Sequence, residues 1–114
     1  MKVKIYHNPR CRKSREALEL LQKEDIEPEI VLYLNVIPTK KEIKGLLEKL
    51  GINAESLVRK NEPFYKEKFK GKKLTEAQWI TAMVSYPKLI ERPIVVKGNK
   101  AIVGRPPTDV LSLF

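Results

Sequence analysis

Near its N-terminus the chain reads Lys2-Val3-Lys4-Ile5-Tyr6-His7-Asn8-Pro9-Arg10-Cys11-Arg12-Lys13-Ser14. The first five of these residues alternate between polar and apolar side chains, which is typical of a half-buried strand. After them, Ala17, Leu18 and Leu21 follow at helical spacing. A strand is therefore expected to change into a helix within a few residues, with Cys11 at the helix N-terminus. The chain has one cysteine and one histidine, and both lie in this connection.

Cys11 is a candidate nucleophile because of this position. Unpaired backbone amides and the positive end of the helix dipole favour a thiolate at a helix start. Arg10, Arg12, Lys13 and Arg15 add positive charge nearby. An ordinary thiol has a pKa of about 8.5, whereas such sites reach roughly 3.5 to 7.5. A lone cysteine is often only a small buried side chain, but these polar and cationic neighbours favour an activated thiolate.

Length and composition indicate one compact domain over residues 1–114, with 42% hydrophobic content. The longest apolar run, residues 30–34, is too short to cross a bilayer. The first residues show neither the apolar region nor the cleavage site of a secretory signal, so we expect a cytoplasmic protein without a membrane partner. A single cysteine forms no internal disulfide, so redox chemistry at Cys11 needs a thiol from another molecule.

Basic residues are in excess, with 23 Lys and Arg against 14 Asp and Glu and a formal charge of +9. This charge attracts anions of many kinds. Much of the excess lies in Lys66-Glu67-Lys68-Phe69-Lys70-Gly71-Lys72-Lys73. Glutamate and turn residues interrupt this run, and no recognised nucleic-acid motif accompanies it, so we expect a solvated surface and not a nucleic-acid interface.

The first half of the chain predicts a βαβ unit followed by helices. A strand over 2–6, a helix over 12–23 and a strand over 29–34 give parallel strands joined by a right-handed crossover. Thr39-Lys40-Lys41-Glu42 has the pattern of a capping box, and Gly51 ends the helix that it begins. A short helix is expected over 53–58.

The second half predicts one more helix, a hairpin and a last helix. Thr75-Glu76-Ala77-Gln78 begins the first of these helices, which ends before Pro87. Two β-rich runs, 94–96 and 101–103, flank the two-residue turn Gly98-Asn99. Prolines then end the second strand, and the last helix is expected over 108–113.

This order of elements predicts an α/β protein of thioredoxin-like fold. Its βαβ and ββα halves form a mixed four-stranded sheet, with a helical insertion of about fifty residues between them. The redox cysteine of that fold follows the first strand, as Cys11 does. A proline that opens the third strand, here Pro93, is commonly cis there and faces the cysteine.

Four segments of the chain resemble the signature segments of the glutaredoxin-coupled arsenate reductases of the ArsC family, which also includes Spx-like regulators. The resemblance extends over essentially the whole chain and its motif order. The segments are Ile5-Tyr6-His7-Asn8-Pro9-Arg10-Cys11-Arg12-Lys13-Ser14-Arg15, Leu57-Val58-Arg59-Lys60-Asn61, Glu91-Arg92-Pro93-Ile94-Val95-Val96 and Gly104-Arg105-Pro106.

The resemblance implies an enzyme, an oxidoreductase in which Cys11 attacks arsenate. It further implies that Arg59, Arg92 and Arg105 hold the oxyanion and its covalent arsenic adduct. Guanidinium groups suit this role because they donate paired hydrogen bonds and stay charged at working pH. The same cations favour the thiolate and disperse charge in the transition state.

His7 and Ser14 are the remaining candidate catalytic residues. His7 either donates a hydrogen bond into the cysteine loop or, as an imidazolium, helps to hold the thiolate. The alternative is that His7 only ends the strand and has no role at the sulfur. Ser14 suits a first helical turn, where its hydroxyl can turn toward the sulfur. It stands where a Cys-x-x-Cys pair has its resolving cysteine, so no intramolecular disulfide can release the product.

The resemblance also implies the reductants. Glutathione, a co-substrate, attacks the Cys11 adduct, arsenite leaves, and glutaredoxin reduces the resulting mixed disulfide. No bound cofactor is expected, and one Cys with one His is too few ligands for a closed metal site. The family often has Gly after the cysteine, whereas this chain has Arg12, a bulky cation that can alter the access of substrate or glutathione.

Two alternatives within the family remain open. One is an Spx-like regulator that binds RNA polymerase, although Ser14 removes half of the Cys-x-x-Cys switch common in such proteins. The other is a thiol reductase that acts on another substrate. The phosphatase-like arsenate reductases are excluded, because they need Cys-x5-Arg and position 17 is alanine.

Overall fold

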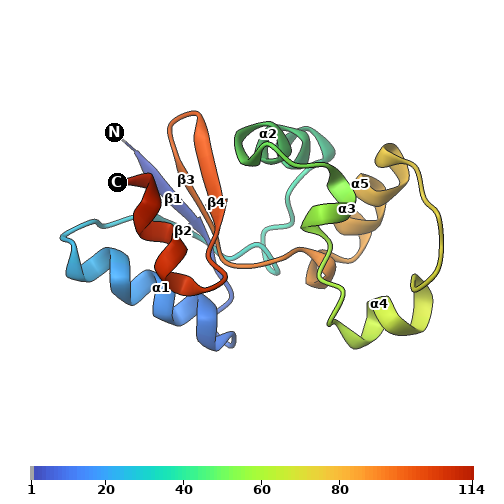
Figure 1. The fold of residues 1–114 in the computed structure, drawn as a ribbon, viewed down its shortest axis with the longest axis horizontal. Helices are drawn as coiled ribbons and strands as arrows, with labels where there is room; N and C mark the ends of the chain where they lie inside the picture. Colours follow the sequence, from blue (N-terminus) through green and yellow to red (C-terminus); the bar gives the residue numbers. More distant parts are fainter. Residues whose placement is uncertain (1) are drawn as a thin grey trace. The chain divides into compact units, whose positions relative to one another are not determined.

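The computed structural model describes residues 2–114, which form two compact units (Figure 1). The first unit combines the chain up to Val36 with Arg92–Phe114, and the second is Ile37–Glu91. The second unit is thus inserted into the first along the chain, as the expected helical insertion requires.

A mixed four-stranded sheet forms the centre of the first unit. Its elements are β1 Val3–Tyr6, α1 Arg12–Lys23, β2 Glu29–Val31, β3 Ile94–Lys97, β4 Lys100–Val103 and the 3₁₀ helix η2 Pro107–Leu113. The strand order is β2-β1-β3-β4. β1 pairs with β2 in parallel, whereas β1 with β3 and β3 with β4 are antiparallel. The predicted βαβ unit, hairpin and mixed sheet are therefore confirmed.

One face of this sheet is covered by α1 and η2, which lie side by side in Figure 1. The core between them consists of Ile5 and Val95 from the sheet, Ala17 and Leu21 from α1, and Val110 from η2, all fully buried. These positions explain the sequence pattern, because alternate residues of a strand share one face and helical spacing places Ala17 and Leu21 together.

Two elements of this unit have other bounds than the sequence predicted. β2 ends at Val31 and not at residue 34, because the chain turns at Leu32, whose carbonyl accepts hydrogen bonds of 2.9 Å from the amides of Asn35 and Val36. The last helix begins at Pro107 and is a 3₁₀ helix. Each backbone hydrogen bond of a 3₁₀ helix spans three residues, one fewer than in an α-helix, which suits a short terminal segment.

The regular elements of the second unit are helices joined by turns and loops, with an isolated bridge between Val58 and Ile90. Its elements are α2 Lys40–Leu50, α3 Ala54–Leu57, α4 Pro63–Lys68, α5 Glu76–Ser85 and η1 Pro87–Leu89. α5 contacts α2, α3 and η1. Both carboxylate oxygens of Glu76 accept from the amide of Ala54 at 3.0 Å, so α5 holds the start of α3.

The helix ends in this unit follow the predicted caps. Thr39 Oγ1 accepts from the amide of Glu42, and Gly51 ends α2 with a left-handed φ of 69°. Thr75 and Gln78 form a reciprocal capping box at the start of α5. Each cap satisfies backbone groups that a helix end leaves unpaired.

α4 is a helix that the sequence analysis did not predict. It has no buried residue, and so it lacks the apolar stripe by which helices are recognised. Its Phe64 packs instead against Tyr86, with ring centroids 4.5 Å apart, and the following Phe69 packs against Trp79 at 5.9 Å. Pro63 begins the helix, where its missing N–H costs nothing.

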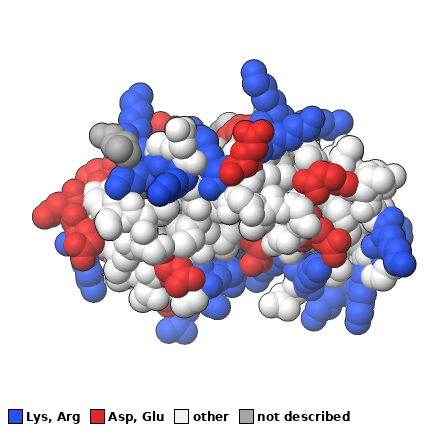
Figure 2. Space-filling view, turned by 45° about the horizontal axis from the view of Figure 1, so that its top comes forward, with Lys and Arg blue, Asp and Glu red and all other residues white. Residues whose placement is uncertain are grey.

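The lysines of residues 66–73 are all exposed. On the face shown in Figure 2, basic and acidic side chains are interspersed, with basic groups gathered at several places. Within residues 2–114, no helix has the length and apolar character needed to cross a bilayer.

Candidate functional site

Cys11 is the N-cap of α1, with extended backbone angles, as the sequence predicted. The loop before it is held by Asn8, whose carbonyl accepts from the amide of Cys11 at 2.9 Å and whose side chain accepts from the amide of Arg10 at 3.0 Å. Arg15 of α1 donates to the carbonyl of Pro9 at 2.8 Å. Hydrogen bonds within the loop, and one from α1 to the loop, therefore hold the backbone that carries the cysteine.

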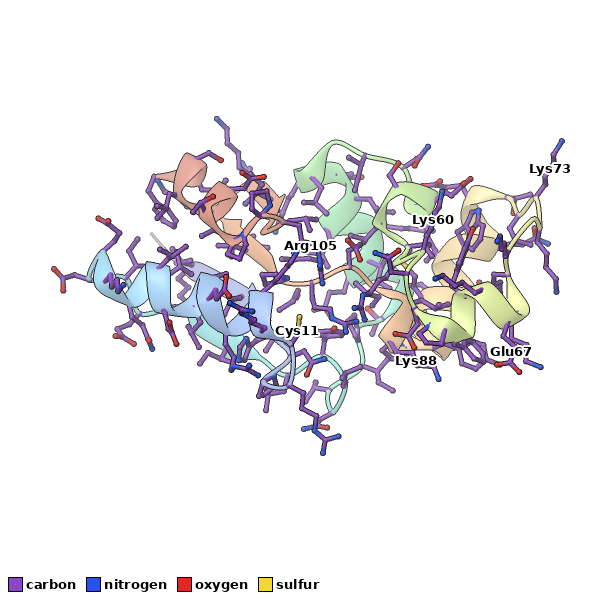
Figure 3. The ribbon with its side chains drawn as sticks, turned by 60° about the horizontal axis from the view of Figure 1, so that its bottom comes forward. Cys11, Lys60, Glu67, Lys73, Lys88 and Arg105 are labelled. Atoms are coloured by element: carbon purple, nitrogen blue, oxygen red, sulfur yellow. The ribbon has the colours of Figure 1, made fainter. Side chains whose placement is uncertain are left out.

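Two arginines from the other end of the chain act on this sulfur. Arg105 Nη2 lies 3.8 Å from Cys11 Sγ, and Arg105 Nε donates to the carbonyl of Arg92 at 2.8 Å. The guanidinium of Arg92, a nearly buried residue, donates a hydrogen bond to the sulfur. Figure 3 shows the Arg105 side chain extending toward Cys11. The peptide bonds Arg92-Pro93 and Arg105-Pro106 are both cis, the first as predicted.

Gly104 lets these two arginine segments approach each other. Its amide donates to the carbonyl of Pro93 at 2.8 Å. A Cβ at this position would lie 2.9 Å from side-chain carbons of both Pro93 and Val110, closer than such atoms pack. Only glycine therefore fits beside Pro93, and this packing holds Arg105 next to Arg92.

The pKa of the Cys11 thiol lies below its ordinary value. Burial is the largest single influence and raises the pKa, but the stabilising groups together outweigh it: the amide of Ser14, the hydrogen bond and charge of Arg92, and the amide of Lys13. The two amides form no standard capping hydrogen bond with the side chain, yet they point where a negative charge on the sulfur is stabilised. The lowered pKa favours the thiolate form, and its role as an activated nucleophile stays a prediction.

His7 and Ser14 form a buried pair behind the cysteine. His7 Nδ1 lies 2.6 Å from Ser14 Oγ, and the amide of Asn8 donates to the same oxygen at 3.1 Å. Ser14 is fully buried and His7 is nearly so. The pair joins the end of β1 to the first turn of α1, so it fixes the two ends of the cysteine loop.

Two features of the structure bear on these candidate roles. The pKa of His7 is lowered, first by burial and then by the charge of Arg15, which favours the neutral imidazole over the imidazolium. The hydroxyl of Ser14 is bonded to His7 and Asn8, and the group of Ser14 that acts on the sulfur is its backbone N–H. Both residues position the loop in this structure.

Arg59 belongs to the second unit. There its guanidinium lies 3.2 Å from Glu62 Oε2 and 3.9 Å from Glu91 Oε1. The structure brings Arg92 and Arg105 to Cys11, while a role of Arg59 in oxyanion binding stays a prediction. Asn8 was missed as a site residue, although an Asn-Pro pair is a turn signal.

No group of three or more His, Cys, Asp or Glu side chains suited to a metal ion occurs among residues 2–114. The groups that do gather are one nucleophilic sulfur and the donors of two guanidinium groups. They can bind an anion and bring it to a thiolate. The fold and this site together define an α/β protein with a cysteine at a helix N-terminus and two arginines beside its sulfur.

Comparisons with known proteins identify the family. Residues 6–113 match the ArsC family, and the chain belongs to it. It is 51% identical to the uncharacterized protein YfgD of Escherichia coli K12, over 97% of this chain and 95% of that protein. It is 42% identical to an arsenate reductase of Haemophilus influenzae over the full length of both.

A solved structure agrees with this assignment. The arsenate reductase from Vibrio cholerae superimposes with a TM-score of 0.95 at 45% identity, covering 100% of this chain and 98% of that one. The thioredoxin-like fold expected from the order of elements is thereby confirmed.

Proposed function

We propose that this protein reduces arsenate to arsenite in the cytoplasm, through a covalent adduct on Cys11, with glutathione and glutaredoxin as reductants. The observation that carries the proposal is the convergence of Arg92 and Arg105 on a sulfur whose pKa is lowered. The names of its relatives, arsenate reductases at about 40% identity or more, agree with an arsenic oxyanion as substrate.

The first step is attack by the thiolate on arsenate. A Cys11 sulfur–arsenic bond forms, one arsenic–oxygen bond breaks, and the oxygen leaves as water after taking up protons. Arg92 and Arg105 balance the charge of the oxyanion and stay charged at working pH. Preorganised donors of this kind are usually the largest single contribution to catalysis.

The second step transfers electrons. The glutathione thiolate attacks the Cys11 sulfur, a sulfur–sulfur bond forms and the sulfur–arsenic bond breaks. Its electron pair stays on arsenic, which is reduced from As(V) to As(III) and leaves as arsenite. Each sulfur is oxidised by one electron. Glutaredoxin then regenerates Cys11 by thiol exchange, because the chain has no second cysteine to do so.

A coupled assay tests this proposal. Arsenate-dependent NADPH oxidation is measured with glutathione, glutaredoxin and glutathione reductase present, each omitted in turn; NADPH serves the recycling enzyme and not this protein. We expect activity that needs every component and is lost in Cys11→Ser. Intact mass after one turnover without glutaredoxin should show a glutathione adduct, and adding glutaredoxin should remove it.

The arginines provide a sharper version of the same assay. Arg92→Ala and Arg105→Ala should lower kcat/KM by about a hundredfold, the usual effect of losing a transition-state donor. Arg59→Ala should show the same if that residue also holds the oxyanion. Lys68→Ala and Lys72→Ala, at exposed positions, serve as controls, and an equal loss there would point to general electrostatics instead.

Other outcomes assign the protein elsewhere in its family. A glutathione adduct that forms with another oxidant but not with arsenate would indicate a thiol reductase of different substrate. Binding to RNA polymerase that persists in Cys11→Ser, without any arsenate-dependent adduct, would indicate a regulator of Spx type.

A further inference from the structure

A cleft of about 340 Å³ lies on the first unit, beside the cysteine loop. It is lined by His7, Asn8, Pro9, Arg10, Leu32, Leu34 and Asn35. We propose that this cleft binds the glutathione that attacks the Cys11 adduct. The inference rests on the proposed function, which requires glutathione as a reductant but does not say where glutathione binds.

The position of the cleft follows from the sheet. β1 and β2 are parallel, so the segments after Tyr6 and Val31 leave the same edge of the sheet. The amide of His7 donates to the carbonyl of Val31 at 2.9 Å and joins them there. Ligands of open α/β sheets bind outside the carboxyl ends of parallel strands.

The cleft is also next to the nucleophile. Arg10 is the immediate neighbour of Cys11, with Cα atoms about 3.8 Å apart across the peptide bond. Asn8, which lines the cleft, accepts the amide of Cys11 with its carbonyl. A ligand held in the cleft therefore contacts the same four-residue turn that presents the sulfur.

The lining suits a small anionic peptide. Glutathione carries two carboxylates and one ammonium group near neutral pH, together with peptide groups and short methylene chains. Arg10 offers an exposed guanidinium for a carboxylate, and Asn8 and Asn35 offer amide groups. Leu32 and Leu34 offer apolar surface at 36% and 42% exposure.

A second cleft on the same unit gives the contrast. It is larger, about 700 Å³, but three carboxylates, those of Asp25, Glu27 and Glu29, line it beside Lys2 and Lys97. Its remaining lining includes Val3, the first residue of β1, so it lies at the opposite end of that strand from the cysteine. Among the described residues that line the cleft at Arg10, none is acidic, and its volume is at the small end of ligand pockets, which hold roughly 300 to 1,000 Å³.

Paired variants test the assignment. Leu34→Asp and Arg10→Glu should each raise the KM for glutathione at least tenfold, with little change in the KM for arsenate. The matched controls are Val36→Asp, an exposed apolar residue of the same segment that does not line the cleft, and Lys23→Glu, an exposed cation in the last turn of α1 that does not line it either. Both controls should stay within twofold of the unchanged protein.

A second measurement does not depend on turnover. S-methylglutathione, which has no free thiol, is added to the isotopically labelled protein, and backbone amide signals are followed by NMR. We expect concentration-dependent shifts at Asn8, Arg10 and residues 32–35 that are absent in Leu34→Asp and retained in Val36→Asp.

The outcomes separate this inference from the proposed function. Arsenate reduction with an unchanged glutathione KM in Leu34→Asp, or without shifts at the cleft, overturns the inference and leaves the function standing. Shifts at the cleft without arsenate reduction overturn the function and retain the glutathione site. If Leu34→Asp and Val36→Asp raise the KM for glutaredoxin equally while that for glutathione is unchanged, the surface docks a protein and the inference is wrong.

Discussion

The guanidinium of Arg105 lies beside the sulfur of Cys11, although the two residues are 94 positions apart in the sequence. The same guanidinium donates a hydrogen bond to the carbonyl of Arg92. The pKa of the Cys11 thiol is therefore lowered by groups of two kinds. The amides of Lys13 and Ser14 come with the helix start, whereas the guanidinium of Arg92 comes with the folded sheet. Substitutions can separate the contributions of these two kinds of group to the pKa of the thiol.

The first prediction concerns this thiol. Arg92→Ala should raise the pKa of Cys11, because it removes both a hydrogen bond to the thiolate and a nearby positive charge. Thiolate absorbance followed against pH measures the change. Lys13→Ala is the control, since Lys13 acts on the sulfur through its backbone amide, which the variant retains. An equal rise in both variants would contradict a specific role of Arg92.

The second prediction concerns His7 and pH. Its pKa is lower in the folded protein than in the unfolded chain, so below about pH 6.5 the unfolded chain binds more protons and the free energy of unfolding falls. His7→Gln does not titrate. The stability advantage of the unchanged protein over His7→Gln should therefore shrink as the pH is lowered from about 8 to 5.

Denaturant unfolding at each pH measures this difference. Acidic groups titrate in both proteins, and comparing the two removes their contribution. An advantage that grows toward low pH would mean that His7 is charged in the folded state, contrary to the neutral imidazole described here.

Helix α2 has one glycine in its interior and another at its C-cap. Gly45 lies inside the helix, and a Cβ there would meet no atom within 4 Å; Gly51 ends the helix with a left-handed φ of 69°. Glycine costs about 0.5–1 kcal/mol in a helix interior relative to alanine, whereas a left-handed conformation costs a residue with a Cβ roughly 1–2 kcal/mol.

The third prediction follows from this pair. Gly45→Ala should increase the free energy of unfolding by about 0.5–1 kcal/mol, and Gly51→Ala should decrease it by about 1 kcal/mol or more. Denaturant midpoints measure both changes. A stabilising Gly51→Ala would show that the end of α2 does not need a left-handed residue.

The sequence-based predictions were wrong for two elements, α4 and β2, and both errors have the same cause. α4 was not predicted because its aromatic rings pack with Tyr86 and Trp79 from later in the chain and not along a stripe of its own. β2 was predicted too long because residues 30–34 are all apolar, although Ile30, Leu32 and Leu34 are exposed. A short apolar run does not reveal where pairing with β1 stops.

The whole chain was expected to be a single domain, and this stays a prediction for the two units. Each unit carries its own reporter: the one tryptophan, Trp79, is buried in the second, and the one cysteine is in the first. At a pH just below the ordinary pKa of a thiol, the thiolate signal of Cys11 should fall on unfolding, because its pKa is lower in the folded protein.

The fourth prediction uses these reporters. Tryptophan fluorescence and thiolate absorbance should give the same midpoint in denaturant, because one domain of this length unfolds cooperatively. Gly51→Ala, a change in the second unit, should shift both midpoints equally. Separate midpoints, or a shift in fluorescence alone, would show two domains.

Much of the architecture follows from local patterns. The capping residues Thr39 and Thr75, the stop at Gly51 and the turn at Gly98-Asn99 each act on backbone within a few residues, so the sequence by itself determined where these elements begin and end. The helix start at Cys11 is local in the same sense. The order of these elements was sufficient for the thioredoxin-like sheet.

The charged site was decided only by the tertiary structure. No local pattern pairs Cys11 with Arg92 and Arg105; the family resemblance pointed to them, and the antiparallel pairing of β3 with β1 brings them to the sulfur. The His7–Ser14 bond and the neutral state of His7 likewise depend on burial. Stabilising a charge requires donors within a few ångströms in space, and spacing along the sequence does not specify that distance.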